Sequence, residues 1–281
     1  MSIYDTLTNV SLLIVARRQA AVSKGRREEA SLWSYVRAFS DFVHVTGQVY
    51  RFEDSLEGAA PTERPLISPR LGKQEGTFAQ PAVKMLLETL GETPEPEEKQ
   101  LVCVLIALLG FIAETGQFDE VEDFFSNLGE YAPVAIAHFN NHQEAETWLN
   151  GVAEPPSPAL ILIGDEYYQF WYMREDNTRG MYRDYAIEPA LEALTARGIP
   201  PQVPSFATRA EAEGWLMSHP ANPYAFVAIG GQYYFAVHHR KLKRHSLHHV
   251  ESALNAWEEH KRAVELDTAL ETATQSGGSG E

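Results

Sequence analysis

The chain has 281 residues, of which 44% are hydrophobic and 22% are charged, so a disordered or fibrous protein is excluded and two domains of ordinary size are allowed. The formal net charge is -16 and is spread evenly, since residues 1–130 hold 12 basic and 20 acidic residues and the remainder holds 11 and 19. A protein this acidic repels nucleic acids and anionic membranes, which favours a basic protein as its partner.

The first 130 residues have the apolar spacing of helices, with intervals of three and four. Leu32, Val36, Phe39 and Val43 are one such stripe. Each helix would bury its stripe against the others, which predicts a helical bundle. The expected helices cover about residues 3–22, 29–57, 78–90 and 119–128 and the apolar run Leu101–Ala113, with a proline- and glycine-rich loop at 58–76.

The apolar run Leu101–Ala113 has 13 residues, whereas a membrane-spanning helix needs about 20. We therefore expect the buried central helix of the bundle and no membrane partner. Cys103 lies in this run and is the single cysteine, which rules out an internal disulfide and reads as a small buried hydrophobe. A reducing compartment suits such a chain, and the predicted location is the cytoplasm.

The second half contains an internal duplication, because matching residues recur in the same order at offsets of 67 and then 66 residues. In the first copy these are Phe139, Glu144-Ala145-Glu146, Trp148-Leu149, Ile163-Gly164 and Tyr167-Tyr168, and in the second Phe206, Glu211-Ala212-Glu213, Trp215-Leu216, Ile229-Gly230 and Tyr233-Tyr234. We expect both tryptophans to anchor the core, and each tyrosine pair to place one ring inside and one outside.

Each copy predicts a β-α-β-β-α unit, in which an apolar strand at 159–163 or 225–229 leads into a glycine-containing tight turn. The first strand of the second copy lies among three prolines, which confine it to a sheet edge. The fold class is therefore α+β, an N-terminal helical bundle followed by two tandem repeats. The expected parts are a bundle at 1–130, repeats at 131–198 and 199–264, and a frayed tail at 265–281.

The Phe…Glu-Ala-Glu-x-Trp-Leu helix entry, the spacing of the prolines and the Ile-Gly-x-x-Tyr-Tyr hairpin resemble the modules of an uncharacterised paralogous protein family expanded in myxobacteria. The resemblance covers the second half of the chain and implies an intracellular, bacterial setting. It implies no activity, and it assigns no functional residues.

The segment 237–249 is the sharpest local feature, with five histidines and four basic residues. Its counterpart in the first copy, Tyr172–Tyr185, is mixed in charge, so the two copies diverge here. This divergence predicts a contact surface, either for an acidic surface of this protein or for an anion or nucleic acid. Four cations on a body of charge -16 make a weak footprint for nucleic acid. The candidate binding residues are Arg240, Lys241, Lys243 and Arg244.

Metal binding is the other interpretation of this segment, through His238, His245 and His249. On a helix, His245 and His249 would share a face, as zinc ligands often do. A transition metal needs three or four ligands, however, and the neighbouring cations oppose a dication, so a solvated strand-to-helix corner is favoured. We therefore assign no metal and no cofactor. The acidic cluster around Asp119 likewise lacks the spacing of a calcium loop and suits a helix start.

The sequence contains no Gly-x-Ser-x-Gly motif of a catalytic serine and no phosphate-binding glycine loop. The favoured hypothesis is a non-enzymatic, intracellular protein-interaction module, a regulatory or immunity-type partner of a basic protein. The alternatives are a binder of nucleic acid or anions through residues 240–244, and a metal-assisted enzyme of unknown class.

Overall fold

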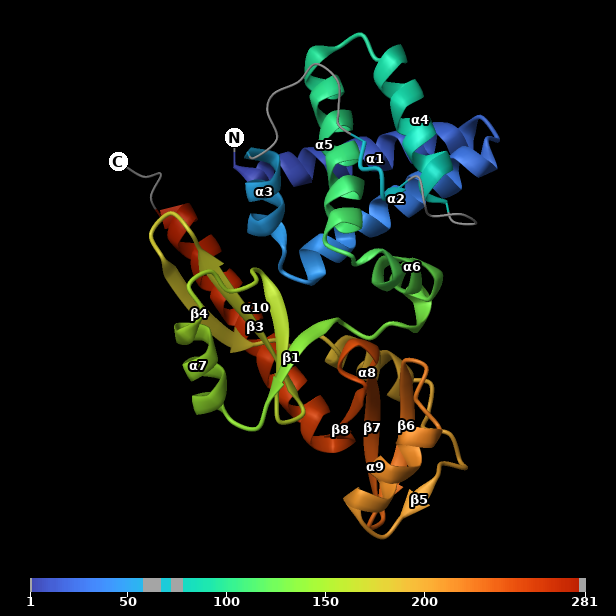
Figure 1. Cartoon of the computed structure of the whole chain (residues 1–281). Helices are drawn as coiled ribbons and strands as arrows, with labels where there is room; N and C mark the ends of the chain where they lie inside the picture. The colour runs from blue at the N-terminus through green and yellow to red at the C-terminus, as the bar shows by residue number, and fades with distance from the viewer. Residues whose placement is uncertain (1, 58–66, 72–77, 278–281) are drawn as a thin grey trace. The chain divides into compact units, whose positions relative to one another are not determined.

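The computed structural model describes residues 2–57, 67–71 and 78–277, and it has the α+β architecture expected from the sequence (Figure 1). The predicted loop at 58–76 lies mostly outside the described residues. The helical region consists of α1 (Ile3–Ser23), α2 (Arg27–Val45), α3 (Val49–Glu57), α4 (Ala79–Glu92), α5 (Pro96–Glu114) and α6 (Phe118–Ser126).

Helix α5 is the centre of the helical region, as predicted. It contacts α1, α2, α3 and α4, and most of its residues from Val102 to Ala113 are buried. Pro96 begins the helix, and Glu97 and Glu98 in the first turn favour the positive end of its dipole. Cys103 is half-buried rather than fully buried. In the described residues, no single helix is long and apolar enough to cross a membrane, and only α5 and α6 taken together pass that test, with a bend of 113° between them.

The predicted helix over 29–57 is in fact two helices, α2 and α3, separated at Thr46–Gln48. Gly47 has φ of +66°, which favours glycine, and a Cβ atom here would lie 2.7 Å from the backbone of Pro156. The amide of Ser157 donates to the Gly47 carbonyl at 2.9 Å. The break was invisible in the periodicity because the apolar stripe continues through it.

Two four-stranded sheets follow, with strand orders β1-β2-β3-β4 and β5-β6-β7-β8. The first pair of each sheet is parallel, and β6, β7 and β8 are antiparallel. The first repeat comprises β1 (Ala135–Phe139), α7 (His142–Gly151), β2 (Ala159–Ile163), β3 (Glu166–Met173), β4 (Thr178–Arg183) and α8 (Glu188–Thr195). The second comprises β5 (Ser205–Phe206), α9 (Arg209–Ser218), β6 (Tyr224–Ile229), β7 (Gln232–His239), β8 (Arg244–His249) and α10 (Val250–Gly277).

Each repeat has one strand more than the sequence predicted, namely β4 and β8. Both are rich in polar residues and lack the apolar alternation of a half-buried strand. In β8 the backbone pairs with β7 along its whole length, from Arg244 to His249. Strand β5 has two residues and lies at a sheet edge, as its prolines predicted.

The chain forms two compact units. The first contains Met1–Leu128 with Trp148–Ala159 and Phe170–Gly180, and the second contains Gly129–Thr147, Leu160–Gln169 and Met181–Glu281. The boundaries expected from sequence at 130 and 198 fall between elements, whereas the one at 264 falls within α10.

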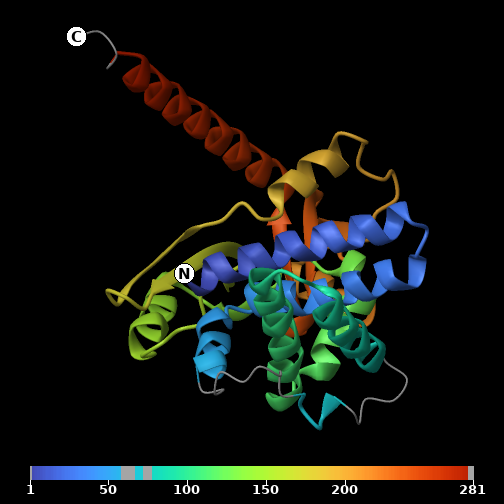
Figure 2. The same cartoon turned by 90° about the horizontal axis from the view of Figure 1, so that it is seen from above.

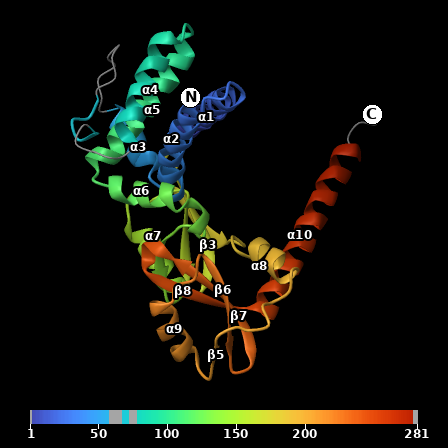
Figure 3. The same cartoon turned by 90° about the vertical axis from the view of Figure 1, so that its right-hand side faces the viewer.

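The sheet of the second repeat is covered on both faces. On one face, Ala236 and Leu247 pack against Ala212 and Leu216 of α9. On the other, Phe235 and Val237 join a larger core cluster that includes residues of α8 and α10. Figure 3 shows α9 and α10 on opposite sides of this sheet. The alternation of side chains along β7 thus determines which helix each residue meets.

Two sequence-based expectations need correction here. Helix α10 continues to Gly277, so the expected frayed tail is helical over most of its length, as Figure 2 shows. Trp148 and Trp215 are half-buried rather than in the core, and they pack against Phe170 and Phe206 respectively. Both helix entries nevertheless bury the neighbouring leucine, as expected.

Substituting Gly47→Ala should lower the free energy of unfolding by about 2–4 kcal/mol, because it adds a Cβ at positive φ against the Pro156 backbone. Urea titration followed by circular dichroism measures this loss. The control is Gly91→Ala in α4, where a Cβ meets nothing within 4 Å and helix propensity predicts a gain of about 0.5–1 kcal/mol. Equal stability of the two variants would contradict the assignment.

Candidate functional site

The predicted basic segment is the turn between β7 and β8 and includes the short helix η3 (Arg240–Leu242). Arg240 forms an ion pair with Glu130 at 3.2 Å, and its guanidinium lies over the Tyr131 ring, 5.2 Å from the centroid. Arg244 lies 3.8 Å from Asp165. These partners belong to the second unit of the same chain, so both arginines are engaged internally.

The two lysines of the segment are exposed, unlike the arginines. Lys243 adopts φ of +52°, in the left-handed region, and its amide closes the turn onto the Arg240 carbonyl at 3.2 Å. Lys241 and residues 131–135 line the same small cavity. The four candidate residues therefore divide into two half-buried arginines that form ion pairs and two lysines with exposed side chains.

The three candidate metal ligands do not converge. His238 and His245 are paired across β7 and β8, with stacked rings whose centroids are 4.6 Å apart. His249 instead bonds Ser252 at 2.8 Å. The shared helix face considered for His245 and His249 is wrong, because both lie on β8 and α10 begins at Val250. Within the described ranges, no group of three or more histidine, cysteine or acidic side chains could hold a metal ion.

A buried chain of hydrogen bonds that sequence reasoning missed runs through the second unit. The Tyr167 hydroxyl lies 2.9 Å from the Pro133 carbonyl and 3.3 Å from Nδ1 of His239. Nε2 of His239 lies 2.8 Å from the Ser246 hydroxyl, which lies 2.8 Å from Nε2 of His248. Tyr167 is therefore a core residue, whereas its counterpart Tyr233 is 45% exposed.

Counting donors and acceptors assigns one proton to each link of this chain. Because Tyr167 donates to the Pro133 carbonyl, Nδ1 of His239 must donate to the Tyr167 oxygen. Nε2 of His239 then accepts from Ser246, and Ser246 accepts from Nε2 of His248. Two neutral imidazoles can therefore satisfy every contact of these hydrogen bonds.

The surroundings favour these neutral imidazoles. Burial, together with the nearby His248 and Arg244, lowers the pKa of His239 from 6.5 to about 3. Burial lowers the pKa of His248 to about 4, and the pKa of His245 to about 4 with a further effect from His238. Ser246 is fully buried, so the chain of bonds has no access for a substrate and is structural.

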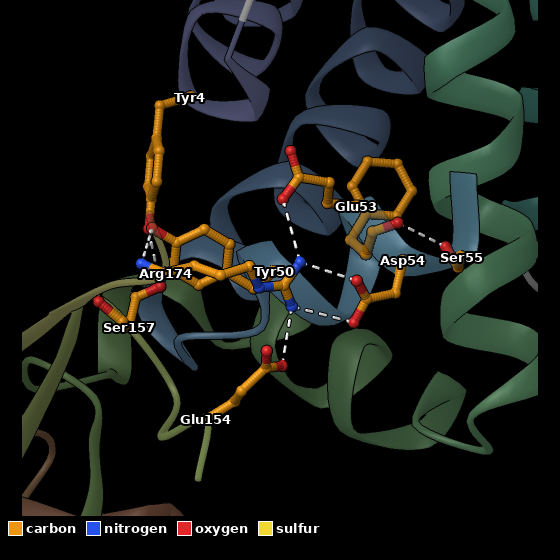
Figure 4. Close-up of polar contacts among 9 residues, drawn as sticks. Tyr4, Tyr50, Glu53, Asp54, Ser55, Glu154, Ser157 and Arg174 are labelled. Carbon is orange, nitrogen blue, oxygen red and sulfur yellow. Dashed lines mark hydrogen bonds and ion pairs between the residues drawn. The ribbon is translucent and has the colours of Figure 1, made fainter. Parts of the chain in front are cut away.

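A second arginine cluster forms in the first unit around Arg174 (Figure 4). Its guanidinium binds both carboxylate oxygens of Asp54, at 2.8 and 3.0 Å, and also Glu154 at 2.8 Å and Glu53 at 3.3 Å. It lies over the Tyr50 ring, 4.7 Å from the centroid. The hydrogen bonds that Arg174 donates to Asp54 and Glu154 raise its pKa above its usual range. These contacts link the segment that follows β3 to helix α3.

Arg174 and Arg240 occupy equivalent positions in the two repeats. Each is the residue directly after the return strand, β3 or β7, at the same offset of 66 that relates the tyrosine pairs. Each lies over a tyrosine ring and binds carboxylate groups of an earlier segment. The duplicated position therefore has one structural role, carried out with different partners in the two units.

Comparison with protein-family models, with curated proteins and with solved structures finds no match to this chain.

Substituting Arg174→Gln should lower the free energy of unfolding by about 1–3 kcal/mol, because three carboxylates would lose their shared cation. Chemical denaturation followed by circular dichroism measures the change. Lys84→Gln is the matched control, since the Lys84–Glu88 pair is exposed on one helix and should be worth less than about 0.5 kcal/mol. A loss no larger than that of the control would show that the cluster is not stabilising.

Stability should fall as the pH is lowered from 7 to 4. In the folded chain, His245 and His248 bind protons only near pH 4, because their pKa values are lowered. In the unfolded chain the same histidines bind protons near pH 6.5, so protons favour the unfolded state between these pH values. Thermal unfolding at half-unit pH steps measures the slope. His245→Gln keeps an acceptor for the Ala221 amide and should flatten the slope. Equal slopes in the wild-type and variant proteins would contradict this account.

Proposed function

We propose that the chain is a non-enzymatic protein-interaction protein, a regulatory or immunity-type partner of a basic protein that acts in the cytoplasm. The proposal is based on the distribution of charged side chains. Nine arginines of the described residues form ion pairs with the chain's own carboxylates, and the net charge of -16 leaves the chain with an excess of acidic groups. The paired arginines are Arg17, Arg26, Arg37, Arg70, Arg174, Arg183, Arg209, Arg240 and Arg244.

Helix α6 is rich in carboxylates, of which Glu122 accepts a hydrogen bond from the Tyr35 hydroxyl and Asp123 accepts one from the Asn127 amide group. Its inner face buries Phe118, Val121 and Phe124, while four of its nine residues are acidic and none is basic. Asp119 is exposed and forms no ion pair within the described part of the chain. Phe78 next to this helix is 47% exposed and packs against Phe125, which places apolar surface beside the carboxylates. Acidic groups around exposed aromatic surface suit a basic protein.

The alternative of nucleic-acid or anion binding through residues 240–244 has less support. Arg240 and Arg244 bind Glu130 and Asp165, and the exposed cations of the segment are Lys241 and Lys243. Two lysines on a body of charge -16 give little attraction for phosphates. The free cysteine, Cys103, is compatible with a reducing compartment.

A pull-down from nuclease-treated lysate of the source organism tests the proposal. The wild-type chain should retain a stoichiometric basic protein at low salt and lose it progressively as ionic strength rises, because screening weakens contacts between exposed charges. Asp119→Lys combined with Glu120→Lys, at two exposed carboxylates of α6, should reduce retention at least tenfold, with the fold verified by circular dichroism.

The matched control reverses the opposite charges, through Lys241→Glu and Lys243→Glu, and it leaves both structural arginines in place. This variant should keep the partner. If it loses binding while the α6 variant keeps it, the contact lies on the basic segment. Gel shifts with duplex DNA at low ionic strength then decide the alternative, and binding abolished by the lysine variant would replace the present proposal.

A further inference from the structure

A groove in the first unit lies between α1 and α2 and is closed at its floor by α6. Its volume is about 450 Å³, within the range of small-molecule sites. Four residues come from α1, five from α2 and its C-terminus, and one from α6. They are Tyr4, Leu7, Thr8, Ser11, Arg37, Ser40, Asp41, His44, Val45 and Phe124.

One wall of the groove is polar and comes from a single face of α2. Arg37, Ser40, Asp41 and His44 have the spacing i, i+3, i+4, i+7, which brings them onto one face. The one contact among them is an ion pair between Nε of Arg37 and Oδ2 of Asp41 at 3.2 Å. In the described ranges, Oδ1 of Asp41, the terminal nitrogens of Arg37 and the ring of His44 have no hydrogen-bond partner.

The opposite wall and floor differ in character. Leu7 and Phe124 are almost fully buried beneath the groove, and Val45 is half-buried beside them. The hydroxyls of Thr8 and Ser11 are already used, since they donate to the Tyr4 and Leu7 carbonyls at 2.9 Å. The Tyr4 hydroxyl likewise donates to the Ser157 carbonyl. The unused hydrogen-bonding groups are therefore those of α2, and an apolar surface lies next to them.

We infer that this groove binds a free α-amino acid with an apolar side chain. The Asp41 carboxylate accepts the ligand's ammonium group, the terminal nitrogens of Arg37 donate to its carboxylate, and its side chain packs on Leu7, Val45 and Phe124. A cation alone would meet Arg37, and an anion alone would meet Asp41. A zwitterion satisfies both groups, which stand one helical turn apart.

The partial burial of Asp41 agrees with this assignment. Desolvation raises the pKa of the Asp41 carboxyl, although Arg37 and His44 act in the opposite direction. A ligand ammonium group would replace lost solvent around this carboxylate and return the pKa toward its ordinary value. The site does not depend on the proposed basic partner, because the residues involved belong to the groove and not to the outer face of α6.

Titration calorimetry of the full chain with L-leucine and L-phenylalanine tests the inference. We expect saturable binding with Kd below about 1 mM. Leucinamide, which lacks the carboxylate, and N-acetyl-leucine, which lacks the ammonium group, should each bind at least tenfold more weakly. Asp41→Asn and Arg37→Gln should weaken leucine binding at least tenfold. Glu88→Gln, in the exposed Lys84–Glu88 pair of α4, should not change it.

Nuclear magnetic resonance of the wild-type chain tests the location of the site without any substitution. Leucine should shift the methyl resonances of Leu7 and Val45 more than those of Leu162 and Val237, which lie in the core of the second unit. No saturable binding of either amino acid at about 10 mM overturns the inference. So does equal binding of the two analogues, or binding that survives in both variants.

Discussion

A guanidinium group stacked on a tyrosine ring and bound to carboxylates is the contact that recurs in both units. Arg174 makes it with Tyr50 and α3, and Arg240 makes it with Tyr131 and Glu130. A planar, delocalised cation can stack and form several hydrogen bonds at once, whereas a lysine cannot do both. The turn after each return strand depends on this contact, because polar turns such as these bury little apolar surface of their own.

The same constraint decides the chemistry of the histidines. Arg244 lies near the buried imidazoles, and a protonated histidine beside it would add a second cation where little water can screen it. Neutral imidazoles avoid that repulsion, and they can form every hydrogen bond between Tyr167 and His248 with one proton in each bond. A segment that resembles a metal or phosphate site in sequence is thus the polar core of the second unit. Burial and the neighbouring arginines lower the pKa of His239 and of His248, which favours their neutral forms beside Arg244.

The elements that could be predicted were those whose pattern is local. The helical stripes, strand β2 and the paired turns follow from spacing alone, and the structure has them within a few residues. Strands β4 and β8 could not be predicted, because their backbones pair with a neighbour while their side chains are polar. Asp54, a partner of Arg174, and Glu130, a partner of Arg240, lie over a hundred residues away in sequence, but the shared offset of the two arginines was visible and marked their common position.

The internal pairing of the arginines also separates two kinds of surface. On the outer face of α6 the carboxylates act over the range of salt screening, about 8 Å under physiological conditions, and attract any sufficiently basic surface. In the groove between α1 and α2, the opposite charges of Arg37 and Asp41 cancel at long range. A ligand distinguishes the two charges only when it contacts both side chains. In the two proposed roles, the first surface would select by net charge and the second by the arrangement of charge within one small molecule. The two proposed sites would not compete, and raising the ionic strength would weaken binding at the first far more than at the second.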